Sequence, residues 1–313
     1  MDPKLDPRRK NSGLFWATGW SAKPSGMAAF DELLARLRSR PETVLVASDY
    51  DGTIAPIVED PSSAVPDPRA VRALSALVGR VGAVAVVSGR PAGFLETMLP
   101  LPGIVYCGLY GMEISLPHGG GIGNRTSSAE SQVSRDFPFD PADWRNLIAS
   151  VVRSAQNDLA ARYPEDFSLE DKGLSLVVHY RKSKERQRAR SVARAWAESV
   201  AQRTGLRIVE GKLNVELLPD VPLGKGKALS RVLSVLGTQI RSLVFLGDDI
   251  GDLDAFEEGR RWAAELNGRL SLCVAIASPE APSELLEKAD LVLEDQGKVW
   301  EFLQGLAAQL EAH

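Results

Sequence analysis

The stretch Val44–Pro56, VLVASDYDGTIAP, decides the fold. Its first half is an apolar run of the kind that is buried on both faces of a parallel sheet. The run ends at Asp49, and Asp51 and Gly52 follow at once. Gly52 predicts that the backbone leaves the strand just after the first acid. Open α/β sheets bind ligands at the carboxyl ends of their strands, so this pattern indicates a site there.

The same pattern returns twice later in the chain. Apolar runs end at polar groups in VVSGR, residues 86–90, and in FLGDDIGD, residues 245–252, and amphipathic helical patterns separate the runs. Strands that alternate with helices predict right-handed crossovers and a parallel sheet. The predicted fold class is therefore α/β, with a doubly wound, Rossmann-like parallel-sheet core.

The pattern changes in the middle of the chain, where long amphipathic helices accompany alternating strands such as GLSLVVHYR, residues 173–181. This change predicts an α+β cap domain inserted into the core. We expect a flexible N-terminal tail at 1–25, a first part of the core at 26–111, the cap at 112–211 and a second part of the core at 212–313.

Composition bounds the class of protein. The 313 residues are 44% hydrophobic and 25% charged, as in folded soluble proteins, and the net charge of -4 argues against a nucleic-acid partner. The two cysteines stand in apolar surroundings without a CxxC partner, which predicts free thiols in a reducing compartment. The chain shows no signal peptide and no run suited to span a membrane. We therefore expect a cytoplasmic protein, a monomer or weak oligomer.

One local stretch, RKSKERQRAR at residues 181–190, is strongly basic. It has two interpretations, the solvated face of a helix or a surface that attracts an anionic substrate or partner. No aromatic residues are interleaved with the charges, so the stretch does not predict a nucleic-acid site.

Acids gather after two of the apolar strands, as Asp49 and Asp51 and then as Asp248, Asp249 and Asp252. A single aspartate at a strand end is often only a helix cap. Carboxylates from two strand ends that meet at one sheet edge repel each other unless a cation lies between them. A hard divalent ion with oxygen ligands would remove this repulsion, and Mg²⁺ is the ion that best fits such a site when a phosphate binds beside it. The sequence therefore predicts a magnesium site at this edge.

Four motifs in this order, DYDGTIAP, SGR, GKGKAL and GDDIGDLDAF, resemble those of the haloacid dehalogenase superfamily of phosphotransferases. Further stretches, GLYGME, LEDKGLSLVVHYR and GKLNVELLP, resemble the trehalose-6-phosphate phosphatase family, whose cap lies between the second and third motifs. The resemblance implies hydrolysis of a small-molecule substrate, trehalose 6-phosphate, through an aspartyl-phosphate with Mg²⁺ as cofactor.

The resemblance also assigns roles. Asp49 is expected as the nucleophile, and Asp51 as the acid that protonates the leaving sugar oxygen and then activates water. Lys225, preferred to Lys227 because a glycine follows it, would hold phosphoryl oxygens with Ser88. The expected metal ligands are Asp49, the backbone carbonyl of Asp51, Asp248 and Asp249, with Asp252 in support. The expected substrate-binding residues are Ser88, Gly89, Arg90, Glu170, Lys172, Arg181, Lys212, Asn214 and Glu216.

The cap residues in this set are expected to share one face of a sheet. In KLNVELL, residues 212–218, the polar positions Lys212, Asn214 and Glu216 alternate with apolar ones. The family's ExK and KxxxE elements recognise trehalose, whereas a solvated sheet face is the alternative interpretation. His179 is expected to be structural, and HGGG at His118 a loop.

Two departures from the family pattern concern substrate contacts and loop geometry. Tyr110 stands where many members have histidine, and Gly251 and Leu253 replace threonine and glutamate of the last motif. Two other functions stay open from the sequence. One is a phosphatase for another sugar phosphate, of the sucrose-6-phosphate or mannosylglycerate-3-phosphate type. The other is a non-catalytic regulator of trehalose synthesis.

Overall fold

A computed structural model describes residues 19–58, 63–117, 141–211, 213–220 and 223–311. The chain divides into two compact units, each described by itself below. The first unit combines Met1–Ser131 with Leu223–His313, and the second is Gln132–Pro222.

The first unit is built on an eight-stranded sheet in the order β1-β12-β11-β10-β2-β3-β4-β5. Its inner pairs are all parallel, from β12 through β4, while β1 and β5 pair antiparallel at the two edges. The strands are β1 (Trp20–Ala22), β2 (Val44–Ser48), β3 (Ala83–Val87), β4 (Ile104–Gly108), β5 (Glu113–Ser115), β10 (Ser242–Gly247), β11 (Leu270–Ile276) and β12 (Leu291–Leu293). The predicted α/β class is confirmed.

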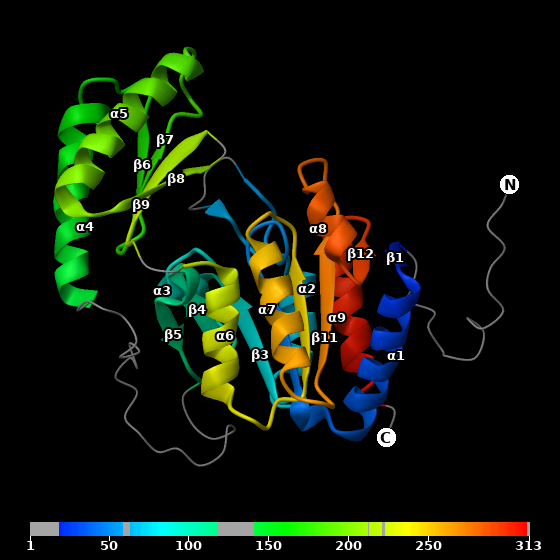
Figure 1. Cartoon of the computed structure of the whole chain (residues 1–313). Coiled ribbons are helices and arrows are strands. Elements are labelled where there is room, and N and C mark those ends of the chain that lie inside the picture. Colours follow the sequence, from blue (N-terminus) through cyan, green and yellow to red (C-terminus); the bar gives the residue numbers. More distant parts are fainter. Residues whose placement is uncertain (1–18, 59–62, 118–140, 212, 221–222, 312–313) are drawn as a thin grey trace, which may run out of the picture. The chain divides into compact units, whose positions relative to one another are not determined.

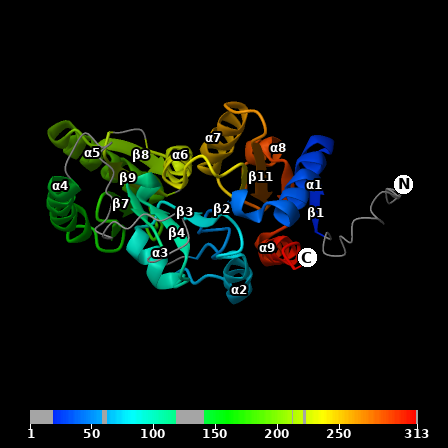
Figure 2. The same cartoon turned by 90° about the horizontal axis from the view of Figure 1, so that it is seen from below.

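Helices cover both faces of this sheet, as Figures 1 and 2 show. On one face, side chains of α1, α2, α3 and α9 share a core with the sheet, and on the other face α6, α7 and α8 do so. The helices are α1 (Pro24–Ser39), α2 (Pro68–Leu77), α3 (Ala92–Met98), α6 (Lys225–Leu236), α7 (Asp252–Ala264), α8 (Ser283–Lys288) and α9 (Val299–Ala308), with short 3₁₀ turns η2 (Pro41–Thr43), η4 (Leu109–Gly111) and η6 (Gln296–Lys298). Because both faces are covered, β2, β3, β4 and β10 are buried at every position, which explains their continuous apolar sequences.

The second unit is a four-stranded antiparallel sheet in the order β6-β7-β9-β8. Its elements are α4 (Pro141–Ala155), a π-helical turn (Gln156–Ala160), β6 (Ser168–Asp171), β7 (Leu176–His179), α5 (Arg186–Thr204), β8 (Arg207–Gly211) and β9 (Asn214–Leu218). Alternate residues such as Leu176, Val178 and Val215 join side chains of α4 and α5 in one core. The helices therefore cover one face of this sheet.

Three boundaries lie elsewhere than the sequence led us to expect. The expected tail, 1–25, includes β1 and the start of α1, because Trp20 packs edge-on against Phe30 at 5.5 Å between ring centroids and β1 pairs with β12; residues 1–18 lie outside the described part. The expected cap, 112–211, begins too early, since β5 pairs with β4 in the large sheet. It also ends too early, because β9 pairs with β7 and β8 in the small sheet.

Candidate active site

Parallel pairing of β2 with β10 brings the two acidic motifs together. Ser48 pairs with Leu246 at the ends of these strands, and the Asp49 N–H donates to the Leu246 carbonyl at 2.8 Å. Asp49 and Asp248 therefore leave neighbouring strands at the same sheet edge, and both are buried, with 3% and 4% exposure. The prediction that these acids meet is confirmed.

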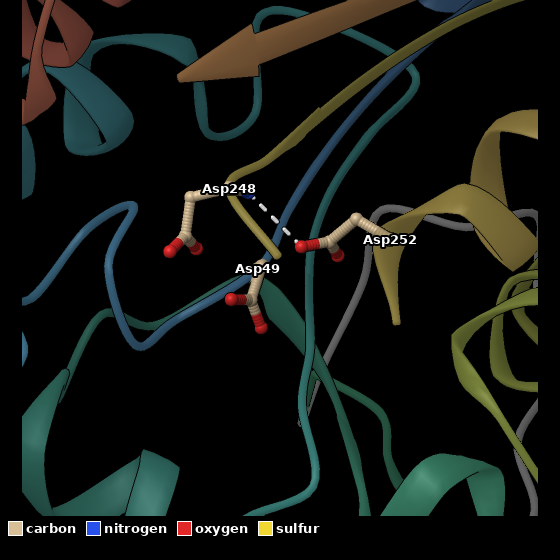
Figure 3. Close-up of side chains that lie close together, drawn as sticks. All are labelled: Asp49, Asp248 and Asp252. Atoms are coloured by element: carbon tan, nitrogen blue, oxygen red, sulfur yellow. Dashed lines mark hydrogen bonds between the residues drawn. The ribbon is translucent and has the colours of Figure 1, made fainter. Parts of the chain in front are cut away.

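Figure 3 shows Asp49, Asp248 and Asp252 with their carboxylates close together. One oxygen of each lies within 4.8 Å of the others, and all three side chains are buried. Asp252, the first residue of α7, accepts the backbone N–H groups of Asp248 and Asp249, at 3.0 Å each, on its Oδ2. Asp252 therefore fixes the loop that carries the other two acids, a role that the sequence had assigned only as support.

Lys225, the first residue of α6, is the cation that faces this cluster. Its Nζ lies 3.0 Å from Asp49 Oδ1 and 2.9 Å from Asp252 Oδ1. A third contact reaches Asp249 Oδ1 at 3.2 Å. Lys225 is 5% exposed, so these contacts are made largely away from water.

The electrostatics of the cluster leave negative charge unbalanced. Burial raises the pKa of Asp49 and of Asp252 well above the usual range, although Lys225 opposes this. Burial likewise raises the pKa of Asp248 to about 7. For Lys225, burial lowers the pKa, but Asp252 and Asp49 outweigh it and hold the value well above normal. Three buried carboxylates facing one ammonium fit a hard divalent cation, which would favour their ionised forms.

Gly52 and Thr53 complete the contact between the two motifs. Gly52 adopts φ 81°, and a Cβ on it would lie 2.0 Å from Asp248 Oδ2, so a side chain at 52 would displace that carboxylate. The Thr53 hydroxyl donates to Asp248 Oδ1 at 3.2 Å. The turn after Asp49 therefore allows the backbone to approach the second acid closely.

Asp51 and Asp249 lie outside the cluster of three carboxylates. Asp51 is held by Arg90, whose Nε and Nη2 reach its two oxygens at 2.8 Å each, and its side chain is 34% exposed. The Asp249 side chain is 57% exposed and pairs with Lys225. Burial raises the pKa of Asp249, but Lys225, together with hydrogen bonds to Asp252 and to the Gly251 backbone, lowers it by more. Asp252 takes the third place in the cluster instead of Asp249.

The SGR motif follows β3, as expected. Ser88 is buried, and its Oγ accepts the Arg90 backbone N–H at 3.1 Å. A Cβ on Gly89 would lie 2.7 Å from the Tyr110 hydroxyl oxygen, so Tyr110 leaves no room for a side chain at 89. Arg90, which we expected to bind substrate, contacts the side chain of Asp51.

In the second unit, predicted sugar-binding residues gather on the sheet face opposite α4 and α5. Cross-strand pairs join Glu170 to Val177 and Val177 to Glu216, so both glutamates share that face. Glu216 accepts from the Ser175 hydroxyl at 2.7 Å and lies 3.4 Å from Lys172 Nζ. His179 Nε2 lies 2.9 Å from Glu170 Oε2.

The remaining predicted residues of this unit differ in what the structure describes of them. Asn214 pairs across the strands with His179 and so shares the same face, whereas Lys212 lies outside the described residues, as does His118. Ser175 and His179 were not predicted as site residues. Their alternation with apolar neighbours was a signal that placed them on the polar face.

The basic stretch 181–190 is largely exposed. Arg181 and its neighbours through Arg188 line an open hollow of about 780 Å³. Arg188 pairs with Glu185 at 2.8 Å, and Arg190 pairs with Glu210. Part of the positive charge is therefore neutralised by the protein itself, as on a solvated helix face.

Comparison with known proteins agrees with this geometry. Residues 47–289 match the trehalose-phosphatase family and include both acidic motifs and Lys225. The chain belongs to the trehalose-phosphatase family. A curated relative, the trehalose-phosphate phosphatase of Mycobacterium marinum (strain ATCC BAA-535 / M), is 32% identical over 265 residues, which cover 84% of this chain and 61% of the relative. The chain thus spans about three fifths of that relative's length.

Solved structures share the fold. The trehalose-6-phosphate phosphatase of Aspergillus fumigatus is 25% identical, with a TM-score of 0.55, and covers 89% of this chain and 97% of its own. The C-terminal domain of the trehalose synthase regulatory protein of Candida albicans is 15% identical, with a TM-score of 0.60. The match covers 88% of this chain and 97% of that domain. The second likeness shows the fold alone, so the side chains of the site must distinguish an enzyme from a regulator.

Within the described ranges of the chain, no helix combines the length and the apolar character that crossing a bilayer requires.

Proposed function

We propose that this protein is a phosphatase that hydrolyses trehalose 6-phosphate to trehalose and phosphate, with Mg²⁺ as its cofactor. The observation that carries the proposal is the buried cluster of Asp49, Asp248 and Asp252 against Lys225, in a chain of the trehalose-phosphatase family. Relatives in mycobacteria are named trehalose-phosphate phosphatases, which supports the same substrate.

The residues that would hold the Mg²⁺ are Asp49, Asp248 and Asp252, with Asp249 and the Asp51 carbonyl as further candidates. When bound, the ion supplies charge that offsets carboxylate repulsion and polarises a phosphoryl oxygen. Asp49 is then ionised and free to act as a nucleophile.

In the first chemical step, an Asp49 carboxylate oxygen attacks the phosphorus, forming a P–O bond while the bond from phosphorus to the sugar oxygen breaks. Asp51 gives its proton to that sugar oxygen, so trehalose leaves as a neutral alcohol. In the second step, Asp51 accepts a proton from water as the water attacks the aspartyl-phosphate, which releases phosphate and restores Asp49. Lys225 and Ser88 would hold phosphoryl oxygens during both steps.

The polar face of the second unit is proposed to recognise the sugar. Its carboxylates Glu170 and Glu216 accept hydrogen bonds from sugar hydroxyls, and Lys172 donates them. The hydrogen bonds from Ser175 and His179 support this role, because they hold the two glutamates in place before a sugar arrives. Lys212, Asn214 and Arg181 are proposed as further contacts.

A panel of sugar phosphates tests the proposal. The protein, with Mg²⁺, is assayed for phosphate release from trehalose 6-phosphate, sucrose 6-phosphate, mannosylglycerate 3-phosphate and glucose 6-phosphate. We expect kcat/KM to be highest for trehalose 6-phosphate. A higher value for another sugar phosphate would refute the substrate, and no phosphate release from any of them would favour a non-catalytic regulator.

A further inference from the structure

The turn after β4 has a strained backbone. Leu109 and Tyr110 have φ angles of 49° and 55°, and Gly111 follows at 94°. For residues with a side chain this left-handed conformation is unfavourable, because the Cβ comes too close to the following carbonyl oxygen. Such strain persists only where the surroundings hold it, and it is concentrated at functional sites.

Hydrogen bonds tie this turn to the SGR motif. The Tyr110 N–H donates to the Ser88 carbonyl at 3.1 Å, and the Leu109 N–H donates to the Arg90 carbonyl at 2.9 Å. From the other side, Arg231 of α6 donates to the Gly111 carbonyl. The strained turn therefore fixes the backbone of the SGR motif.

Side-chain packing limits the motif further. The ring of Tyr110 lies directly over Gly89, as the 2.7 Å approach of its Cζ to a Cβ built there indicates. Gly108, just before the turn, approaches the Arg90 carbonyl so closely that a Cβ on it would lie 2.7 Å away. The turn and the motif are thus packed backbone against backbone.

Arg90 transmits this position to Asp51. Its guanidinium makes two parallel bonds of 2.8 Å to the Asp51 carboxylate, a geometry that fixes both planes relative to each other. The same guanidinium lies over the ring of Phe94 at 4.8 Å, and Phe94 packs edge-on against Tyr50. Arg90 is 12% exposed at its side chain, so it has little freedom to turn away.

We propose that the turn Leu109–Gly111 and Arg90 form a positioning device for Asp51. The strained turn holds the SGR backbone, and Arg90 then holds the Asp51 carboxylate at one angle toward the leaving oxygen. This inference rests on the proposed function, in which Asp51 protonates the sugar oxygen. Arg90 acts through Asp51 and not by binding the sugar phosphate.

Leaving groups separate positioning from general damage. The first chemical step is followed in single turnovers with protein in excess, as release of trehalose from trehalose 6-phosphate and of p-nitrophenolate from p-nitrophenyl phosphate. Trehalose must be protonated as it leaves, whereas p-nitrophenolate leaves without a proton. In Arg90→Lys, which keeps the charge but loses the two parallel bonds, we expect trehalose release to slow about tenfold or more. Release of p-nitrophenolate should stay within about threefold, and the protein concentration that gives half the maximal rate of trehalose release should be unchanged.

Two glycine variants test the turn itself. Gly111→Ala places a Cβ 2.9 Å from Ala228 Cα at a φ of 94°, while Gly79→Ala has a similar φ of 74° but nothing within 4 Å. Gly111→Ala should repeat the selective loss of Arg90→Lys, and Gly79→Ala should not. If Gly111→Ala does not fold, Tyr110→Gly replaces it, because glycine accepts the same φ while the ring over Gly89 is removed.

Several results would overturn the inference. Equal slowing of both leaving groups would mean general damage to the site, and unchanged rates in Arg90→Lys would mean that Asp51 needs no such support. If Arg90→Lys needed more protein to reach half the maximal rate of trehalose release but kept the same maximal rate, Arg90 would be a substrate contact. Failure of the unaltered protein to release trehalose would instead refute the proposed function, and the inference with it.

Discussion

The two units carry their polar residues in opposite ways. In the first unit, Asp49, Asp248 and Asp252 are buried together and face one lysine, so their charge is not balanced within the protein. In the second unit, Glu170 and Glu216 lie on one face of a sheet, Glu216 with 9% exposure, and each has a polar partner on the same sheet. Buried charge without compensation is costly, whereas a carboxylate that is hydrogen-bonded and faces a cation costs much less.

The difference indicates what each region does. The buried cluster of three carboxylates and one ammonium fits a divalent cation, in keeping with the phosphoryl transfer proposed above. The two glutamates are instead held by neighbouring side chains of the same sheet. Changes in the first unit are therefore expected to remove chemistry from every substrate, and changes in the second to alter the choice of substrate.

The largest effect is expected from Asp49→Asn, which keeps the shape of the side chain but removes the nucleophile. Phosphate release from trehalose 6-phosphate and from p-nitrophenyl phosphate should both fall by about three orders of magnitude or more. Asp31→Asn, on the exposed side of α1, is the matched control. A remaining rate of even one tenth with either substrate would mean that Asp49 is not the nucleophile.

The next effect concerns the stability of the cluster without metal. Because burial raises the pKa of Asp248 from 3.8 to about 7, the folded protein binds more protons than the unfolded chain in that pH range. The free energy of unfolding with EDTA should therefore decrease as pH rises from about 4 to 7, by about 3 kcal/mol.

Denaturant unfolding at several pH values measures this slope. Mg²⁺ should restore stability most at the upper end of the range, and Asp248→Asn should flatten the slope in EDTA. EDTA should also abolish phosphate release until Mg²⁺ is added back. Stability in EDTA that increases with pH, in both the unaltered protein and Asp248→Asn, would contradict the balance of charge described for the first unit. Phosphate release that persists in EDTA would contradict it as well.

A smaller and selective effect is expected in the second unit. Glu216→Ala removes a sugar acceptor, so kcat/KM for trehalose 6-phosphate should fall about tenfold or more, while p-nitrophenyl phosphate stays within about threefold. Glu210→Ala, in the adjacent strand but exposed and paired with Arg190, is the control. Equal losses on both substrates would remove the distinction between the two units.

The smallest effect is expected from Ser175→Ala. The change removes the hydroxyl that donates to Glu216 at 2.7 Å and leaves the glutamate in place. KM for trehalose 6-phosphate should rise about threefold to tenfold with kcat nearly unchanged, since a hydrogen bond to a charged group contributes about 1.5–3 kcal/mol at most. Ser191→Ala on the exposed side of α5 should change neither parameter. A fall in kcat with constant KM would place Ser175 in the chemistry.

Much of the fold was predictable because of burial. Strands such as β2 and β10 lie between two layers of helices, so their apolar runs are continuous and easy to recognise. The edge strands β1 and β5 have three residues each, too few to show a period, and their pairing depends on partners far along the chain. The alternating pattern of β9 was visible in the sequence. Its place in the small sheet was not, because that depends on pairing with β7, which lies far along the chain.

The candidate site shows the same limit. The meeting of Asp49 and Asp248 follows from strand order, because parallel neighbours end at one edge. The exchange of Asp249 for Asp252 in the cluster depends on where α7 begins, which a sequence pattern sets only to within a few residues. The bond between Arg90 and Asp51 depends on side-chain packing and the strained turn after β4, neither of which has a signature in the sequence.

The most direct test of the account is to trap the intermediate on Asp49. The protein is mixed with trehalose 6-phosphate and Mg²⁺, quenched in acid, treated with borohydride, digested and analysed by mass spectrometry. We predict that Asp49 alone is reduced to homoserine, that Asp51 is not, and that EDTA prevents the change. Release of phosphate with Asp49 unmodified at every quench time, or reduction of a different aspartate, would contradict the account.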